Sequence, residues 1–267
     1  MAEPGGTAQG DVDTMLALAV VAKGADCDVW KPQFCSNPER MCERRHIGID
    51  HPKRAHYQQA YSWLRWSEDA LQAFREICDK LGMKLALSVY LPEDVPTVAK
   101  YADILKIASF ENDDWELLRS VEATSLRRIV SAGQQCDDDD GTRTRGFYRW
   151  IMDRYMAGFE TIQCTSEYPA KITDLATIRN YLLSGLSDHS RDLDMGMMAV
   201  CAGATIIETH YRLYDCNPEN PDYSVAFDPG ELAMYVGKIR KAERAMGDGV
   251  KRVTESEREM LRYRVNA

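Results

Sequence analysis

The sequence predicts a single α/β domain of the (β/α)8 barrel class, and three observations support this fold class. Short apolar runs alternate with helix-length amphipathic segments along the 267 residues, a repetition typical of a parallel sheet covered by helices. Polar residues follow the end of each apolar run, as they do at the carboxyl face of such barrels. The length also fits, because barrels of about 250 residues form one domain.

The alternation assigns each element in turn. Strands are expected at 28–31, 84–89, 104–107, 128–131, 161–164, 183–189 and 205–210. Helices are expected at 11–23, 68–81, 95–101, 115–121, 147–156, 175–182, 192–201 and 230–246. Seven strands are one short of eight, and Pro4, Gly5 and Gly6 disfavour a strand at the preceding Ala2-Glu3. We therefore predict a barrel whose first strand is truncated or replaced, with an edge that another segment must cover.

Two segments interrupt this rhythm. Residues 34–66 have no clear period and contain three histidines, so we expect a long loop that acts as a lid over the carboxyl face. Residues 134–145 contain four consecutive aspartates, which lack the alternating spacing of a calcium-binding loop. We expect an acidic, solvated loop there.

Composition excludes several classes of partner. The formal net charge is −9 with no basic stripe, which argues against binding nucleic acid or an anionic membrane. No apolar run approaches the roughly 18 residues of a membrane span, and residues 1–6 do not resemble a signal peptide. Several of the eight cysteines fall inside elements that should be buried, a pattern that indicates reduced thiols and a cytoplasmic location.

Two histidines close neighbouring apolar runs near the C-terminal end, His189 and His210. The carboxyl ends of neighbouring parallel strands converge on one face, so both imidazoles are candidate ligands of one divalent metal. Asp188 and Glu208 are the nearest candidates in the sequence to hold the second ring nitrogens. The alternative is that both histidines are ordinary polar residues at strand ends.

Lysines and hydroxyls follow other strands at the same face. Lys31 and Lys106 lie within apolar strands, where an unpaired ammonium is costly, so both are expected to face a polar mouth. Ammonium groups and serine hydroxyls around a metal form a receptor for a phosphate or a carboxylate. The alternative is that these lysines are salt-bridged residues of the barrel.

Four motifs carry a resemblance to a known family, in the order and spacing in which they stand here. They are Leu105-Lys106-Ile107-Ala108-Ser109, Cys164-Thr165-Ser166-Glu167-Tyr168-Pro169, Gly185-Leu186-Ser187-Asp188-His189 and Ile207-Glu208-Thr209-His210. With these motifs, Pro221-Asp222 and residues 246–251, the sequence resembles the sialic acid synthase family. The resemblance covers residues 10–264. Members of that family condense phosphoenolpyruvate with an N-acetylated amino sugar such as N-acetylmannosamine.

The resemblance implies a role for each matching residue. His189 and His210 would bind Mn²⁺ or Mg²⁺, and Lys31 and Lys106 would hold phosphoenolpyruvate. The hydroxyl donors would be Ser109, Ser131 and Ser187, with Ser166 where the family has an asparagine. Glu111, Tyr168 and Asp222 fall on sugar-contacting positions. Glu3 falls on the family's glutamate near the reacting centre, so we expect Glu3, Glu111 and Tyr168 to act in catalysis.

The sequence also departs from the family pattern. Val89 replaces a hydroxyl that the family carries, and Thr7-Ala8 stand where the family has Asn-His. Typical members continue into a small antifreeze-like domain, which supplies an arginine to the sugar site of the partner in a homodimer, whereas this chain stops at Ala267.

Three functions are compatible with this pattern. The first is a phosphoenolpyruvate-dependent condensation with an amino sugar or a related aldehyde, which forms a sialic acid-like 2-keto acid and releases phosphate. The second is an inactive or weak relative that serves as a binding or assembly subunit. The third is another metal-dependent barrel aldolase. Because both histidines and both lysines are retained, the sequence favours the first.

Overall fold

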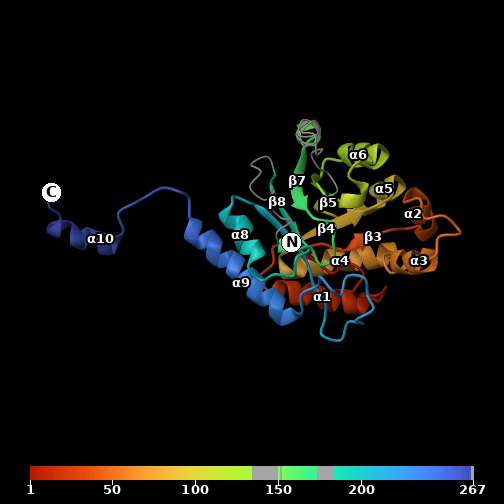
Figure 1. Ribbon diagram of the computed structural model, residues 1–267, viewed down its shortest axis with the longest axis horizontal. Helices are drawn as coiled ribbons and strands as arrows, with labels where there is room; N and C mark the ends of the chain where they lie inside the picture. The colour runs from red at the N-terminus through yellow and green to blue at the C-terminus, as the bar shows by residue number, and fades with distance from the viewer. Residues whose placement is uncertain (134–149, 151, 173–182, 266–267) are drawn as a thin grey trace.

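Eight parallel strand positions form a closed barrel with helices on its outside (Figure 1). The computed structural model describes residues 1–133, 150, 152–172 and 183–265. The strands are β1 (Ala2–Glu3), β2 (Val29–Trp30), β3 (Gln33–Phe34), β4 (Lys84–Val89), β5 (Ile104–Ile107), β6 (Arg127–Ser131), β7 (Phe159–Cys164), β8 (Gly185–Asp188) and β9 (Ile206–His210). β2 and β3 occupy one position, because both pair in parallel with β4 on either side of Lys31-Pro32.

The first strand is short but present. Ala2 pairs with Trp30 of β2 and with Thr209 of β9, and Glu3 pairs with His210. Pro4 and Gly5 follow this strand, so the missing N–H of Pro4 removes no ladder bond. The prediction of a truncated first strand is confirmed. The edge that we expected another segment to cover is closed by β1 itself, which pairs with β2 on one side and with β9 on the other.

The covering helices begin and end where the local sequence dictates. Ser67 caps α4 (Glu68–Leu81) by accepting a hydrogen bond from the Ala70 N–H, and Gly82 ends it in a left-handed conformation with φ 63°. Asp228 caps α9 (Pro229–Met246) in a reciprocal pair with Glu231. The other helices are α1 (Val12–Gly24), α5 (Val95–Val98), α6 (Trp115–Glu122) and α8 (Met195–Cys201), with 3-10 turns η1 (Pro92–Asp94) and η2 (Ser109–Glu111).

Residues 34–66 are not the long loop that we predicted. They contain two helices, α2 (Pro38–Arg44) and α3 (Arg54–Ser62). These helices bury Met41, Cys42 and Tyr61 in a small apolar cluster with Tyr90 and Leu91, which lie beyond the end of β4. Each helix is too short, and buries too few residues, to show a helical period in the sequence. The segment nevertheless covers the carboxyl face, as expected.

The barrel interior is divided into an apolar floor and a polar upper layer. Ala86, Ile104, Ile129, Ile162 and Ile206 form the floor, one from each of five strands. Above it, towards the carboxyl ends of the strands, the inward side chains are charged or hydroxylic. The polar layer therefore has an apolar layer below it, towards the amino ends of the strands.

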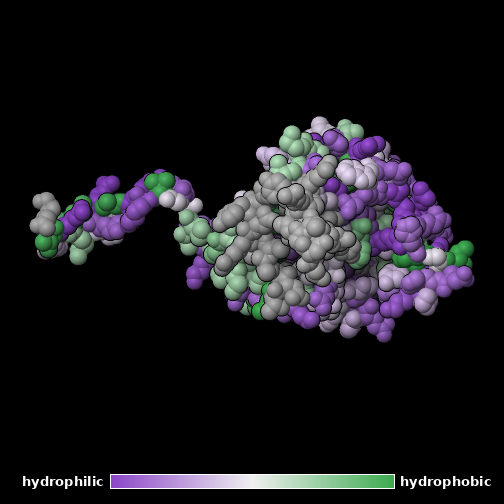
Figure 2. Space-filling model, turned by 45° about the horizontal axis from the view of Figure 1, so that its top comes forward, coloured by the Kyte–Doolittle hydropathy of each residue, from purple (hydrophilic) through white to green (hydrophobic). Residues whose placement is uncertain are grey.

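The C-terminal residues leave the barrel after α9. They form α10 (Glu255–Met260) and the turn η4 (Leu261–Tyr263), which bury no residue, and they lie clear of the rounded body (Figures 1 and 2). In the described part of the chain no helix combines the length and apolar character needed to cross a membrane. The seven described cysteines are free thiols. The acidic loop expected at 134–145 and the helix expected at 175–182 lie outside the described residues, as do 147–149 and 151 of the helix expected at 147–156.

Candidate active site

A pocket of about 410 Å³ opens at the carboxyl face of the barrel. It brings together ten of the twelve site residues that the sequence predicts. They are Glu3, Lys31, Lys106, Ser109, Ser131, Tyr168, Ser187, His189, His210 and Asp222. Ser166 and Glu111 do not line it.

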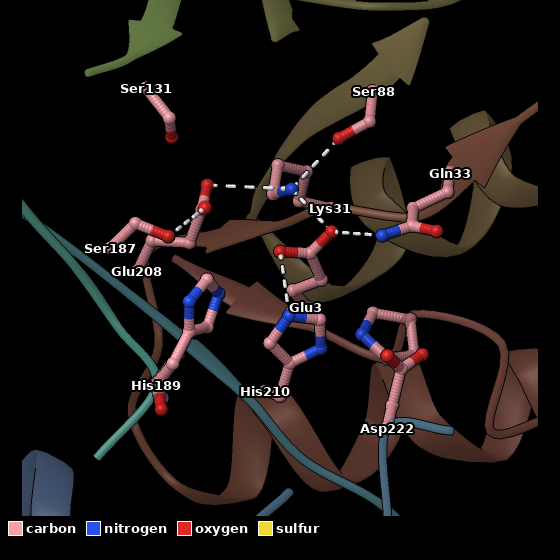
Figure 3. Close-up of polar contacts among 12 residues, drawn as sticks. Glu3, Lys31, Gln33, Ser88, Ser131, Ser187, His189, Glu208, His210 and Asp222 are labelled. Atoms are coloured by element: carbon pink, nitrogen blue, oxygen red, sulfur yellow. Dashed lines mark hydrogen bonds and ion pairs between the residues drawn. The ribbon is translucent and has the colours of Figure 1, made fainter. Parts of the chain in front are cut away.

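Lys31 lies at the bottom of this pocket with two carboxylates and a hydroxyl around it (Figure 3). Its Nζ is 2.6 Å from Glu3 Oε1 and 3.4 Å from Glu208 Oε2, and it donates to Ser88 Oγ at 2.8 Å. Burial alone would lower the pKa of this ammonium. The carboxylates of Glu208 and Glu3 outweigh burial, so the pKa of Lys31 lies above its ordinary value and the side chain is a permanent cation.

Lys106 is buried as deeply but has weaker partners. Its Nζ donates to Ser131 Oγ at 2.7 Å and to the Ile107 carbonyl at 3.2 Å, and it lies 3.5 Å from Glu208 Oε1. Burial lowers its pKa, the attraction of Glu208 opposes that effect, and the nearby Lys31 lowers the pKa further. The net result is a pKa below the ordinary lysine value, so Lys106 is the more easily deprotonated of the two.

Glu208 joins the two lysines, a role that we did not predict for it. It lies 3.4 Å from Lys31 and 3.5 Å from Lys106, and Ser187 Oγ donates to its Oε1 at 2.7 Å. Burial raises its pKa, but the two ammonium groups lower it far more, so the carboxyl is ionised. Two buried cations therefore face two buried anions, Glu3 and Glu208, in one network.

The two histidines lie side by side at the edge of this network, with ring centroids 5.3 Å apart. His189 Nδ1 donates to the Thr165 carbonyl at 2.9 Å, and its Nε2 lies 3.4 Å from the Tyr168 hydroxyl. His210 Nε2 is 3.6 Å from Glu3 Oε2, and His210 Nδ1 is buried without a hydrogen-bond partner among the described residues. The carboxylates expected to orient the rings do not do so: Asp188 Oδ2 instead accepts from the Tyr235 hydroxyl at 2.7 Å.

These imidazoles fit one divalent transition metal. Two adjacent rings, one fixed through Nδ1 on a backbone carbonyl and the other with an orphaned buried nitrogen, are a suitable donor pair. In the described residues no group of three or more histidine, cysteine or acidic side chains is arranged for a metal. Water or substrate would have to complete the shell, which is the open arrangement of a catalytic site.

Tyr168 and Asp222 border the histidines on the side of the pocket mouth. The Tyr168 ring stacks on His189 with centroids 4.5 Å apart, and its hydroxyl is 3.4 Å from His189 Nε2. Asp222 Oδ2 accepts from the Gly6 N–H at 2.8 Å. Gly5 is required here, because its φ is +56° and a Cβ would lie 2.3 Å from Asp222 Oδ2.

The two predicted residues outside the pocket have other partners. Ser166 Oγ donates to Ser109 Oγ at 2.8 Å, so it supports a residue of the pocket wall. Glu111 Oε1 accepts from Arg45 Nε at 2.7 Å, and Glu111 lines a neighbouring cavity. The guanidinium of Arg45, which itself lines the active-site pocket, holds the carboxylate of Glu111. The role of Glu111 with the sugar stays a prediction.

Sequence reasoning also missed several residues that line or support the pocket. Among them are Gln33, Arg45, Ser88, Cys164 and Glu208. A signal existed for Ser88, because it is the register partner of Lys106 on the neighbouring strand. A signal existed for Glu208 as well, because it stands two residues before His210 on one strand and so shares its face.

Comparison with known proteins agrees with this geometry. The profile of the NeuB family matches residues 18–251. This chain belongs to the NeuB family. N-acetylneuraminate-9-phosphate synthase of Mus musculus is 26% identical over 276 residues, which cover 96% of this chain and 73% of that protein. N,N'-diacetyllegionaminic acid synthase of Campylobacter jejuni is 36% identical over 107 residues, which cover 38% of this chain and only 32% of that protein.

A solved structure has the same fold as this NeuB-family chain. N-acetylneuraminic acid synthetase of Leptospira borgpetersenii, in complex with citrate, superposes with a TM-score of 0.78 at 23% identity, covering 98% of this chain and 89% of that one. The likeness confirms the predicted (β/α)8 class. Family membership, with a buried charged pocket at the carboxyl face, identifies the chain as an enzyme of the sialic acid synthase type.

Proposed function

We propose that this NeuB-family enzyme condenses phosphoenolpyruvate with the aldehyde of an amino sugar, giving a sialic acid-like 2-keto acid and phosphate. The observation that carries the proposal is the buried pair Lys31 and Lys106, held between Glu3 and Glu208 beside two histidines. The names of the relatives support an N-acetylated sugar as the acceptor. Free cysteines throughout the described barrel support a reducing, cytoplasmic location.

The charges of the pocket suit a substrate with two anionic groups. Each ammonium can donate to a phosphate or carboxylate oxygen when substrate displaces its serine or carboxylate partner. The carboxylates of Glu3 and Glu208 already balance the two lysines, so further positive charge is needed for a trianionic ligand. We propose that a divalent ion on His189 and His210, Mn²⁺ or Mg²⁺, supplies that charge and polarises the aldehyde when bound.

The chain's own residues position the reactants and move one proton. The C2–C3 π electrons of phosphoenolpyruvate form the bond from C3 to the aldehyde carbon, whose own π pair moves onto the aldehyde oxygen. The oxygen of a water molecule bonds to C2, and one proton of that water ends on the aldehyde oxygen, which becomes a hydroxyl. The bond from C2 to the phosphate oxygen then breaks, and the C2 hydroxyl becomes the keto group as its proton leaves with phosphate. Glu3 faces the reaction space between Lys31 and His210, and the pKa of its carboxyl is lowered: burial raises it, but Lys31 and then His210 outweigh burial. We assign Glu3 as the carboxylate that receives the proton of the attacking water.

The test begins with binding of phosphoenolpyruvate alone. Calorimetry on the wild type in the presence of Mn²⁺ is compared with Lys31→Ala and Lys106→Ala. Each loss of a charge-assisted contact should cost roughly 1.5–3 kcal/mol, about ten- to a hundredfold in affinity. Lys84→Ala is the matched control, because Lys84 lies on β4 but its side chain is exposed at the opposite end of the barrel.

Phosphate release with phosphoenolpyruvate, Mn²⁺ and a panel of amino sugars then tests the reaction. We expect phosphate only when an N-acylated amino sugar is present. Wild-type binding of phosphoenolpyruvate that is undetectable at millimolar concentration would exclude the proposed function.

A further inference from the structure

Lys106 differs from Lys31 in the partners of its amino group. Its Nζ donates to Ser131 Oγ at 2.7 Å and to the Ile107 carbonyl at 3.2 Å, and both acceptors are uncharged. Its ion-pair partner among the described residues, Glu208, lies 3.5 Å away. Lys31, in contrast, has a carboxylate oxygen at 2.6 Å. A buried ammonium without a close ion pair is poorly stabilised, so this geometry favours a neutral amine at Lys106 more than at Lys31.

The pKa of Lys106 agrees with this difference. Burial lowers the pKa, the carboxylate of Glu208 opposes that effect, and the cation of Lys31 lowers the pKa further. A desolvated lysine beside another cationic group is an arrangement that makes an amine nucleophilic. The amine is also within reach of a ligand, because Lys106 lines the active-site pocket.

Three neighbours of this amine suit it to react with a carbonyl group. Lys31 is a permanent cation in the same pocket and can hold a carboxylate. Glu208 lies between the two lysines, at 3.4 and 3.5 Å, and its ionised carboxylate can carry a proton from nitrogen to a departing oxygen. Ser131 orients the amine, and Figure 3 shows Ser131, Glu208 and Lys31 around one space. A ketone with a carboxylate on the adjacent carbon matches these positions.

We propose that Lys106 is a nucleophile that forms an imine with short 2-keto acids. The amine nitrogen bonds to C2 of the keto acid, and Glu208 moves a proton from nitrogen to the former carbonyl oxygen. The second N–H proton follows, the oxygen leaves C2 as water, and the nitrogen lone pair completes the C=N bond. This reaction needs no phosphoenolpyruvate, sugar or metal, so it goes beyond the proposed condensation.

Reductive trapping of the metal-free full chain with pyruvate and cyanoborohydride at neutral pH tests the inference. Cyanoborohydride delivers hydride to C2 of the imine and water supplies a proton to nitrogen, which leaves a stable secondary amine. Proteolysis and mass spectrometry then locate the adduct. We expect a pyruvate-derived adduct on Lys106, with Lys31 unmodified because it stays protonated.

A second ketone and an exposed lysine separate this site from general reactivity. Acetone lacks the carboxylate that Lys31 would hold. Lys84 is exposed on β4 and pairs with Asp103, so its modification in the same digests records the intrinsic reactivity of each ketone. The ratio of Lys106 to Lys84 modification should be at least about tenfold higher with pyruvate than with acetone, which is the effect of one charge-assisted contact.

Two variants complete the test. Lys106→Arg keeps a cation but cannot form an imine, so it should lose this adduct while trapping at Lys84 is unchanged. Lys84→Arg is the matched control and should leave the adduct on Lys106 at the level of the wild type. Mapping of the wild type identifies the reactive residue by itself, so the result does not depend on how well a variant folds.

Three results would overturn the inference: no adduct on Lys106 of the wild type, an adduct on Lys31 in its place, or equal Lys106-to-Lys84 ratios with pyruvate and with acetone. Failure of the proposed condensation is distinguishable, because that reaction is measured by phosphoenolpyruvate binding and phosphate release, neither of which enters the trapping experiment.

Discussion

Replacing the two buried lysines one at a time should destabilise the protein unequally. At an effective dielectric constant near 20, the Lys31 contacts at 2.6 and 3.4 Å correspond to roughly 11 kcal/mol of gross attraction, and the Lys106 contact at 3.5 Å to roughly 5 kcal/mol. Lys31→Met therefore leaves Glu3 without its main partner and should lower the free energy of unfolding by about 3–5 kcal/mol at pH 7. Lys106→Met leaves Glu208 with Lys31 and should cost less than about 2 kcal/mol.

The difference should also depend on pH, with a defined sign. In the wild type the pKa values of Glu3 and Glu208 are lowered, so these carboxylates stabilise the fold above pH 4.5 and the contribution is lost as pH falls through the lowered values. In Lys31→Met burial dominates and raises the pKa of Glu3. The ionised carboxylate of Glu3 then lowers the stability of the fold, and protonation removes that loss. The gap between wild type and Lys31→Met should therefore narrow from pH 7 towards about pH 5.

Urea unfolding of the metal-free full chain measures both effects. Methionine keeps the length of the lysine stem, so packing is similar in the two variants. Equal losses for Lys31→Met and Lys106→Met at pH 7, or a gap that does not change with pH, would refute the charge-balance reasoning.

Three further outcomes are expected. The affinity for phosphoenolpyruvate should fall as pH rises through the lowered pKa of Lys106, below the ordinary 10.5, when calorimetry is run at increasing pH. An affinity for phosphoenolpyruvate that stays constant up to pH 10.5 would contradict this role of Lys106. Manganese content by elemental analysis should drop in both His189→Ala and His210→Ala, and full retention in both would place the metal elsewhere. Gly5→Ala should push Asp222 aside and raise the KM for the acceptor, at a stability cost of about 1–3 kcal/mol; an unchanged KM would argue against a role of Asp222 with the acceptor.

Two matched variants serve as controls for this group. His46→Ala removes an exposed imidazole away from the metal-site pair and should leave manganese content unchanged. Gly24→Ala adds a methyl group at the end of α1, where a Cβ would meet nothing within 4 Å. It should leave both stability and acceptor kinetics near wild type.

The strand order and the residues at strand ends were predictable because both follow from local periodicity. β4 and β5 match the predicted ranges, and Lys106, His189 and His210 were placed at one face from their positions alone. The first strand was not predictable in this way. Two residues before a proline have no period, and Ala2 and Glu3 are held in the sheet by partners near residues 30 and 210.

The contacts between side chains within the site could not be predicted from the sequence pattern. Glu208 was expected beside a histidine, but its place between two lysines follows from the barrel's curvature, which brings β2 and β5 towards β9 across the interior. The partner of Glu111 could not be predicted for a similar reason. Arg45, which donates to its carboxylate, comes from a segment whose short helices left no recognisable period.

The pairing of the first strand with the last has a consequence for how the molecule matures in the cell. Ala2 and Glu3 leave the ribosome more than two hundred residues before their partners Thr209 and His210. At about 5–20 residues per second, translation separates them by roughly 10–40 s. Glu3 and His210 meet only when that wait ends. The reaction centre is therefore assembled by the closing step itself, and a nascent chain cannot hold a finished centre before its ninth strand has emerged.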